Sequence, residues 1–171
     1  VQVNEPKLAA QNKSLSLSQK LKKLSEQKKR KKIARQNLKT NNPSQQQLSS
    51  LLGYYQNGRF NDAEKLAITI SKDFPNHPFS WKVLGAVLGT TGRKSEAVEA
   101  NQTAVALSPQ DAEAHYNLGN TLQELGRLGE AEASYTQAVA LKPDYVEAHN
   151  NLGVTLQELG RLDEALASYT Q

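Results

Sequence analysis

The 171-residue sequence contains no cysteine and no methionine, and it has only one tryptophan and three phenylalanines. Without cysteine there is no disulfide, no thiolate ligand for zinc and no thiol nucleophile. No apolar run approaches the roughly 20 residues that a membrane helix needs, and the N-terminus lacks the charged segment and apolar stretch of a secretory signal. We therefore expect a cytoplasmic protein whose helices pack closely through small side chains.

Positive and negative charges are divided unevenly between two parts of the chain. Residues 1–43 hold 12 Lys and Arg and two Asp and Glu, a net charge of +10. The totals of 21 and 17 leave nine basic (21 − 12) and 15 acidic (17 − 2) residues in 44–171, a net charge of −6. The sequence predicts a basic N-terminal arm over 1–43, partly helical or disordered, and a mildly acidic body over 44–171.

One period of 34 residues runs through the second part. Three residue types recur with this period and in one phase, as a repeat architecture requires. They are Gly58, Gly92, Gly126 and Gly160, then Ala63, Ala97, Ala131 and Ala165, then Pro75, Pro109 and Pro143.

Each period contains two helical patterns and no alternating β-branched run. In the third copy one apolar face ends at Gly126, which can take the left-handed conformation of a helix C-terminus. A second face ends at Pro143, which lacks the amide hydrogen. The predicted helices are 44–57, 60–73, 78–91, 94–107, 112–125, 128–141, 146–159 and 162–171.

These residues resemble the tetratricopeptide repeat (TPR) family. Counted from Ala112, Leu118 and Gly119 stand at positions seven and eight, and Ala131, Tyr135 and Pro143 at 20, 24 and 32. The resemblance implies an all-α fold, a right-handed α-solenoid of helix-turn-helix repeats. We assign a degenerate repeat at 44–77, full repeats at 78–111 and 112–145, and a truncated repeat at 146–171.

The sequence offers no catalytic, metal or cofactor site. His115 and His149 suggest a metal pair, but they share a repeat position with Trp81, and zinc needs a further ligand. The glutamates at the interhelical turns are expected near helix N-termini, and the periodic glycines form no phosphate loop. We therefore expect this chain not to be an enzyme, and we expect no cofactor.

The resemblance implies that partners bind in a concave groove lined by the first helix of each repeat. Carrying over the family's contact positions gives Val83 and Ala86 together with a set of candidate site residues. The set is Lys82, Glu113, Tyr116, Asn117, Asn120, Gln123, Glu124, Glu147, Asn150, Asn151, Val154, Gln157 and Glu158. Glu113 and Glu147 stand where chaperone-binding members have lysine or asparagine, so no clamp for a terminal carboxylate is expected.

Two asparagines make the repeats similar to those of bacterial O-linked N-acetylglucosamine transferases. Asn117 and Asn151 occupy position six, where those repeats carry an asparagine ladder that holds an extended peptide backbone. An asparagine amide can donate to and accept from one peptide unit. The alternative is that each asparagine is satisfied within its own repeat.

The basic arm permits three interpretations. Leu17, Leu21 and Leu24 follow helical spacing, and the run KKRKK at 28–32 interrupts the apolar face. The segment is a solvated leader, or it contacts nucleic acid or an anionic membrane through residues 20–39, or its leucines dock on the acidic body or a partner.

The resulting prediction is a protein-interaction scaffold that binds a protein or an extended peptide. The alternative is that this chain is the substrate-presenting N-terminal region of a larger glycosyltransferase or sulfotransferase whose catalytic domain lies elsewhere. In the truncated repeat, Leu152, Leu156, Leu166 and Tyr169 are expected to form an uncovered apolar surface. That surface predicts self-association, or fraying of 162–171.

Overall fold

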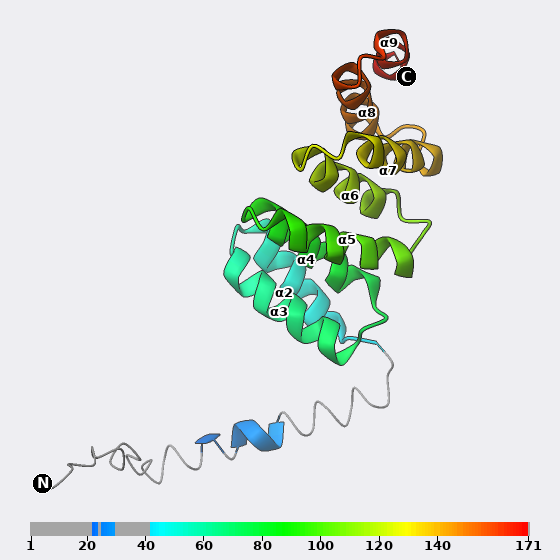
Figure 1. Ribbon diagram of the computed structural model, residues 1–171. Coiled ribbons are helices and arrows are strands. Elements are labelled where there is room, and N and C mark those ends of the chain that lie inside the picture. The colour runs from blue at the N-terminus through cyan, green and yellow to red at the C-terminus, as the bar shows by residue number, and fades with distance from the viewer. Residues whose placement is uncertain (1–21, 24, 30–41, 171) are drawn as a thin grey trace, which may run out of the picture. The chain divides into compact units, whose positions relative to one another are not determined.

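The computed structural model describes residues 22–23, 25–29 and 42–170 (Figure 1). The chain divides into two units between Asn41 and Asn42. In the first unit, residues 22–23 and 25–29 are helical and exposed, and the Ser25 hydroxyl donates to the Lys22 carbonyl at 2.7 Å. The three leucines of the predicted amphipathic helix and residues 30–32 lie outside the described residues.

Within residues 42–170 every element of regular secondary structure is a helix, which confirms the predicted all-α repeat fold. Its helices are α2 (Gln45–Gln56), α3 (Phe60–Asp73), α4 (Pro78–Thr90), α5 (Lys94–Leu107), α6 (Ala112–Glu124), α7 (Leu128–Leu141), α8 (Val146–Glu158) and α9 (Leu162–Tyr169). Every bound lies within two residues of its prediction. Successive helix pairs stack on one another along the unit (Figure 1).

A glycine in the left-handed conformation makes each turn within a helix pair. Gly58, Gly92, Gly126 and Gly160 have φ between 69° and 81°. The residue after each of them donates its amide to a carbonyl five residues back, as Arg127 does to Leu122 at 2.9 Å. This hydrogen bond satisfies a carbonyl at the helix end, and it gives all four pairs the same reversal.

A second set of glycines allows the two helices of a pair to approach closely. A methyl group on Gly119 would lie 2.6 Å from the Tyr135 ring, and one on Gly153 would lie 2.5 Å from the Tyr169 ring. In the first repeat the large and small side chains change places: Leu51 stands where the other repeats have glycine, and Ala67 stands where the second repeat has Asn101 and the last two have Tyr135 and Tyr169. Leu51 and Ala67 are both fully buried in one cluster, so the degenerate repeat keeps a filled core.

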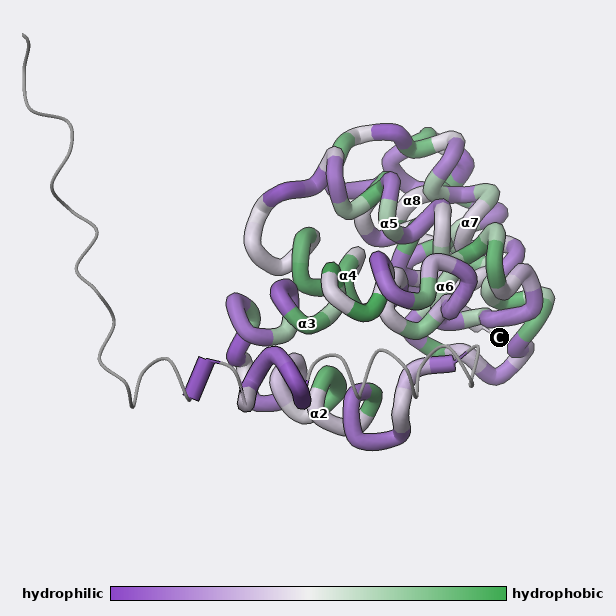
Figure 2. Tube along the Cα trace, turned by 90° about the horizontal axis from the view of Figure 1, so that it is seen from below, coloured by the Kyte–Doolittle hydropathy of each residue, from purple (hydrophilic) through white to green (hydrophobic). Residues whose placement is uncertain are grey.

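The apolar side chains form two core clusters. One gathers residues of α2 to α5 around Leu51 and Ile70, and the other gathers residues of α5 to α9 around Leu122 and Tyr135. Along each helix apolar and polar residues alternate in short stretches (Figure 2), as expected for helices buried on one side. No helix in the described part of the chain has the length and apolarity needed to cross a membrane.

The last repeat corrects one expectation. Leu152 and Leu156 are buried, at 8% and 4% exposure, because their face of α8 packs into the second cluster. The other two residues of the expected surface, Leu166 and Tyr169 of α9, are exposed at 65% and 43%. Leu162 of α9 and Val146 of α8 are exposed as well, at 64% and 65%. Self-association through this repeat stays a prediction, with Leu166 and Tyr169 and without Leu152 and Leu156 in its surface.

Candidate functional site

The first helices of the repeats lie alongside one another. α4 contacts α6, and α6 contacts α8. We call the surface that these three helices share the first-helix face. It carries the 13 candidate residues predicted from the sequence: Lys82 on α4, and six residues each on α6 and α8. Val83 does not contribute, since it is buried in the first core cluster.

Three tyrosines meet between the third and fourth repeats. The Tyr116 ring of α6 lies 6.0 Å from the Tyr135 ring of α7 and 5.0 Å from the Tyr145 ring, with both pairs tilted. Tyr135 is fully buried, and this burial raises its pKa above the ordinary value. Burial, followed by the negative charge of Glu113, raises the pKa of Tyr145 to about 12. Tyr135 and Tyr145 therefore stay neutral at physiological pH.

A hydrogen-bond network connects two of these tyrosines, Tyr116 and Tyr135, to Asn120 and Asn151 of the first-helix face. The Tyr135 hydroxyl lies 2.7 Å from Asn120 Oδ1 and 2.9 Å from Gln123 Oε1, and it can donate to either. Asn151 Nδ2 donates to Asn120 Oδ1 at 2.8 Å and lies 3.4 Å from the Tyr116 hydroxyl. The bond between the two amides joins the third repeat to the fourth.

This amide pair presents one donor and one acceptor to the solvent. Asn120 uses its oxygen and Asn151 its nitrogen within the network, which leaves Asn120 Nδ2 and Asn151 Oδ1 without a partner among the described residues. Neither of these two atoms is buried. A hydrogen bond between two amides always uses one donor and one acceptor. The pair therefore leaves one donor and one acceptor available even if both side-chain amides are flipped.

Asn117, the other predicted ladder residue, is placed differently. Its side-chain amide makes no hydrogen bond to any described residue, and its atoms reach the solvent. The backbone carbonyl of Asn117, in contrast, accepts hydrogen bonds from Thr121 Oγ1 at 2.9 Å and from Asn101 Nδ2 at 3.3 Å. The structure therefore brings Asn151 together with Asn120 of the preceding repeat, and not with Asn117.

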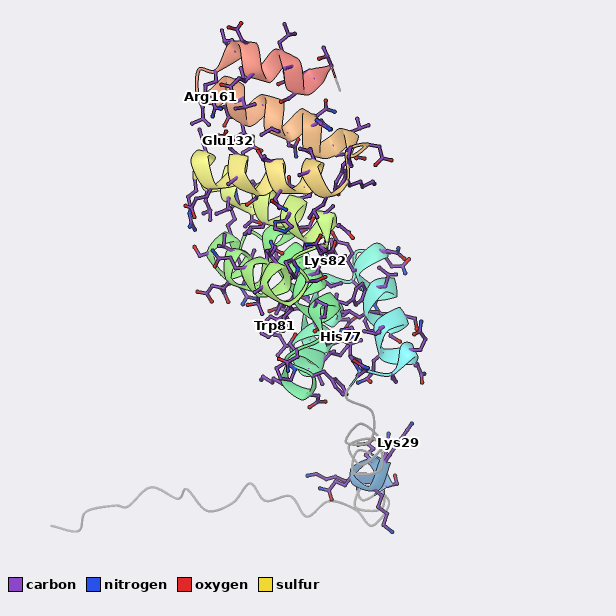
Figure 3. All side chains as sticks on the ribbon, turned by 90° about the vertical axis from the view of Figure 1, so that its right-hand side faces the viewer. Lys29, His77, Trp81, Lys82, Glu132 and Arg161 are labelled. Atoms are coloured by element: carbon purple, nitrogen blue, oxygen red, sulfur yellow. The ribbon has the colours of Figure 1, made fainter. Side chains whose placement is uncertain are left out.

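Lys82 is engaged within the protein. Its ammonium lies 2.9 Å from Asp111 Oδ2 and 2.7 Å from Glu113 Oε2, with the side chain 16% exposed. Burial alone would lower the pKa of Lys82, but the hydrogen bonds to Glu113 and Asp111 outweigh it and raise the pKa. Lys82, labelled in Figure 3, thus ties the second repeat to the third through Glu113, and its charge is compensated by the two carboxylates.

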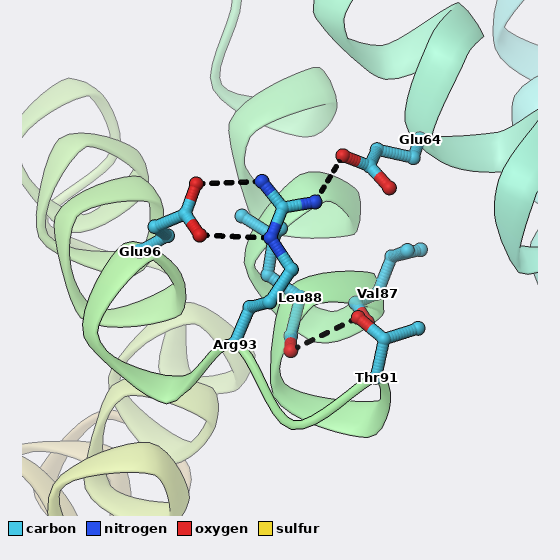
Figure 4. A network of polar contacts seen from close by, with 6 residues as sticks. All are labelled: Glu64, Val87, Leu88, Thr91, Arg93 and Glu96. Carbon is cyan, nitrogen blue, oxygen red and sulfur yellow. Dashed lines mark hydrogen bonds and ion pairs between the residues drawn. The ribbon is translucent and has the colours of Figure 1, made fainter.

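Arginines at the turns hold successive repeats in register on the side of the second helices. The Arg93 guanidinium donates two hydrogen bonds to the Glu96 carboxylate in its own repeat and one to the Glu64 carboxylate of the preceding repeat (Figure 4). Arg161 does the same with Glu164 and Glu132, and the labelled Arg161 and Glu132 lie near each other in Figure 3. The Arg161–Glu132 contact joins the third repeat to the fourth, the two repeats that carry the amide pair.

The histidine pair has a structural role in place of the metal role considered from the sequence. His115 Nε2 lies 3.0 Å from the Pro109 carbonyl, and His149 Nε2 lies 2.9 Å from the Pro143 carbonyl. Trp81 makes the same contact with the Pro75 carbonyl at 2.8 Å. The ring nitrogen thus satisfies the carbonyl of the loop between repeats. The described residues contain no group of three or more His, Asp or Glu arranged to hold a metal ion.

Tyr145 is the site residue that sequence reasoning missed. It stands 34 residues after Asp111, whose side chain caps α6 by accepting from the amides of Glu113 and Ala114. α8 has no such side-chain cap. The replacement of a capping residue by an aromatic one at the same repeat position was the available signal. The structure accounts for it by the contact between Tyr145 and Tyr116.

Comparisons with known families identify the repeats. Residues 116–171 match the family model described as Tetratricopeptide repeat, and residues 91–126 match the one described as TPR repeat. None of the curated proteins matches the chain.

Solved structures share the fold. A crystal structure of MamA superposes with a TM-score of 0.70 at 22% identity, covering 91% of this chain and 92% of that one. MamA from Desulfovibrio magneticus RS-1 gives a TM-score of 0.68 at 22% identity, covering 82% and 89%. A mutant O-GlcNAc transferase from Thermobaculum terrenum gives a TM-score of 0.60 at 28% identity, covering 67% of this chain and 23% of that one.

Proposed function

Because residues 91–171 belong to the tetratricopeptide repeat family, we propose that the chain is a protein-interaction scaffold whose first-helix face binds an extended polypeptide. The observation that carries this proposal is the Asn120–Asn151 pair, with its free donor and free acceptor. An extended backbone offers an N–H and a C=O from each peptide unit, and it leaves both available when no strand partner is present.

The surroundings of the pair suit such a ligand. Tyr116 and Tyr145 are half-buried, so they offer apolar contact area next to the amides at a low cost in side-chain entropy. The Tyr135 hydroxyl and the contacts between repeats hold the amides in place before a ligand arrives. Preorganisation of this kind reduces the entropy lost on binding. Main-chain recognition at the pair gives affinity for many sequences, and the flanking side chains select among them.

Removal of the pair tests the proposal. The probe is a fluorescent peptide of about twelve residues in which serine alternates with glutamine, a neutral segment whose reach when extended is about 40 Å. Asn120→Ala with Asn151→Ala should weaken its binding by about tenfold or more, since each lost hydrogen bond contributes about 0.5–1.5 kcal/mol.

The matched control removes two amides from outside the first-helix face. Gln102 and Gln137 are exposed on α5 and α7, and Gln102→Ala with Gln137→Ala should leave the dissociation constant unchanged. Equal affinity of the asparagine variant and the parent chain, by fluorescence anisotropy, would show that the peptide does not use this pair.

A second candidate function is favoured by the likeness to the O-GlcNAc transferase. This chain covers 23% of that protein, so it corresponds to a part of it. In this alternative the first-helix face presents substrate polypeptides to a transferase domain elsewhere in a longer parent protein. The gene sequence beyond the codon for Gln171 tests it: a glycosyltransferase or sulfotransferase domain would support the alternative, and further repeats followed by a stop codon would refute it.

The basic arm takes no part in this proposal. Contact with nucleic acid or an anionic membrane through residues 20–39 falls mostly on residues outside the described ones, and the matched proteins give it no support.

A further inference from the structure

The helices that carry the amide pair have charges of one sign only. α6 has Glu113 near its start and Glu124 at its end, and α8 has Glu147 and Glu158 at the equivalent positions. Neither helix contains a lysine or an arginine. The four carboxylates therefore flank the tyrosines and asparagines at both ends of the third and fourth repeats.

Two of these carboxylates have no cation within the described protein. Glu113 pairs with Lys82, and Glu124 lies 3.2 Å from Lys94. Glu147 and Glu158 form no ion pair with any described residue, and both are exposed. Their charge is thus available to a ligand.

The negative potential of the carboxylates reaches the tyrosines. After burial, which is the larger cause, Glu113 and Glu147 help to raise the pKa of Tyr145 to about 12. Glu124 and Glu158 likewise help to raise the pKa of Tyr135. The tyrosine cluster therefore lies between two zones of negative potential, one at each end of α6 and α8.

A cation already occupies part of this aromatic surface. The Lys142 ammonium lies over the Tyr145 ring, 4.6 Å from its centroid. Electron-rich ring faces attract ammonium and guanidinium groups, and nearby carboxylates strengthen the attraction. This internal contact is an observation independent of the carboxylates, and it shows that a lysine side chain is accommodated beside Tyr145.

We propose that the first-helix face of α6 and α8 selects extended polypeptides that carry lysine or arginine. The inference rests on the proposed function, because the amide pair holds the backbone while Glu147, Glu158 and the tyrosine rings receive the basic side chains. Charge complementarity supports this occupant, since the array has a net charge of −6 over residues 44–171. Side chains at alternate positions of an extended segment lie about 6–7 Å apart, so one segment brings several cations to the face.

The test compares two peptides that differ only in charge. The neutral serine–glutamine peptide is set against the same peptide with lysine in place of glutamine. The titrations use the full chain with its own basic run neutralised, so that this run does not compete. The changes are Lys28→Gln, Lys29→Gln, Arg30→Gln, Lys31→Gln and Lys32→Gln.

The lysine peptide should bind about tenfold more tightly than the neutral one at about 0.05 M salt, and less so at about 0.15 M, because salt screens exposed charges. Glu147→Gln with Glu158→Gln should reduce that advantage by about fivefold, as expected for the loss of two partly exposed ion pairs. Asp73→Asn with Glu99→Gln removes the same charge from α3 and α5, where both side chains are exposed, and should leave the advantage intact.

The outcomes separate the two proposals. If the neutral peptide binds and the lysine peptide binds no better, the selection for cations is refuted and the main-chain site stands. The selection would also be refuted if Asp73→Asn with Glu99→Gln reduced the advantage of the lysine peptide as much as Glu147→Gln with Glu158→Gln does. That result would mean that only the net charge of the chain matters. If neither peptide binds, the proposed function itself fails.

Discussion

Single glycines set the distance between the two helices of a repeat. In the third repeat the Tyr135 ring lies where a side chain on Gly119 would lie, and the same ring supports the amide pair through its hydroxyl. The close approach of α6 and α7 is thus the residue-scale condition for the candidate site.

Gly119→Ala should therefore destabilise the protein by about 1–3 kcal/mol, the usual cost of overpacking a core, because the added methyl meets the ring at 2.6 Å. Gly129→Ala is the matched control: Gly129 lies in α7 with negative φ and nothing within 4 Å of an added methyl. It should stabilise by about 0.5–1 kcal/mol, since glycine loses more backbone entropy than alanine in a helix. Urea unfolding of both variants measures the difference, and a stable Gly119→Ala chain would contradict the packing account.

At the scale of helices, each second helix begins at an arginine that forms an ion pair with a carboxylate in its own first turn. Hydrogen bonds from Arg93, Arg127 and Arg161 are the main reason that the pKa of each partner, Glu96, Glu130 and Glu164, is lowered from its ordinary value. These carboxylates are charged more readily in the folded chain than in the unfolded chain. Their contribution to stability is present above the unfolded pKa, about 4.5, and is lost as the pH falls through the lower folded values.

The urea midpoint should accordingly decrease as the pH is lowered from about 5 to about 3. A chain with Glu96→Gln, Glu130→Gln and Glu164→Gln should lose less stability over this interval, because three of the titrating groups are gone. The same pH dependence in the parent and the triple variant would show that these ion pairs do not contribute. All three glutamates are exposed, so the difference is expected to be small.

The helix ends could be predicted from the sequence because a glycine follows the first helix of every repeat and a proline follows the second helix of three repeats, all with one period. The packing of the first repeat, with Leu51 at the glycine position and Ala67 at the position of a larger side chain, could not be predicted. The two residues lie 16 apart in the sequence, and neither matches the repeat pattern alone. The partner of Asn151 was also beyond the sequence: the pattern placed it in a ladder with Asn117, whereas packing of α8 on α6 brings it to Asn120. Lys82 matched a contact position, but its carboxylate partners lie about one repeat further along the chain.

At the scale of the whole molecule, stacked repeats convert a local pattern into a continuous surface. Each repeat contacts its neighbours, so the first-helix face extends as far as repeats are added. Polar and aromatic side chains gather on this face between the third and fourth repeats. Both helices there are acidic, and two of their carboxylates have no ion-pair partner among the described residues.

The most direct test of the central claim is to map peptide binding by NMR. The isotope-labelled full chain is titrated with the neutral serine–glutamine peptide, and backbone and side-chain amide signals are followed. We predict saturable shifts of the Asn120 and Asn151 side-chain amides and of the backbone amides of α6 and α8. Shifts confined to α5, α7 or α9, or no shifts at all, would contradict the account.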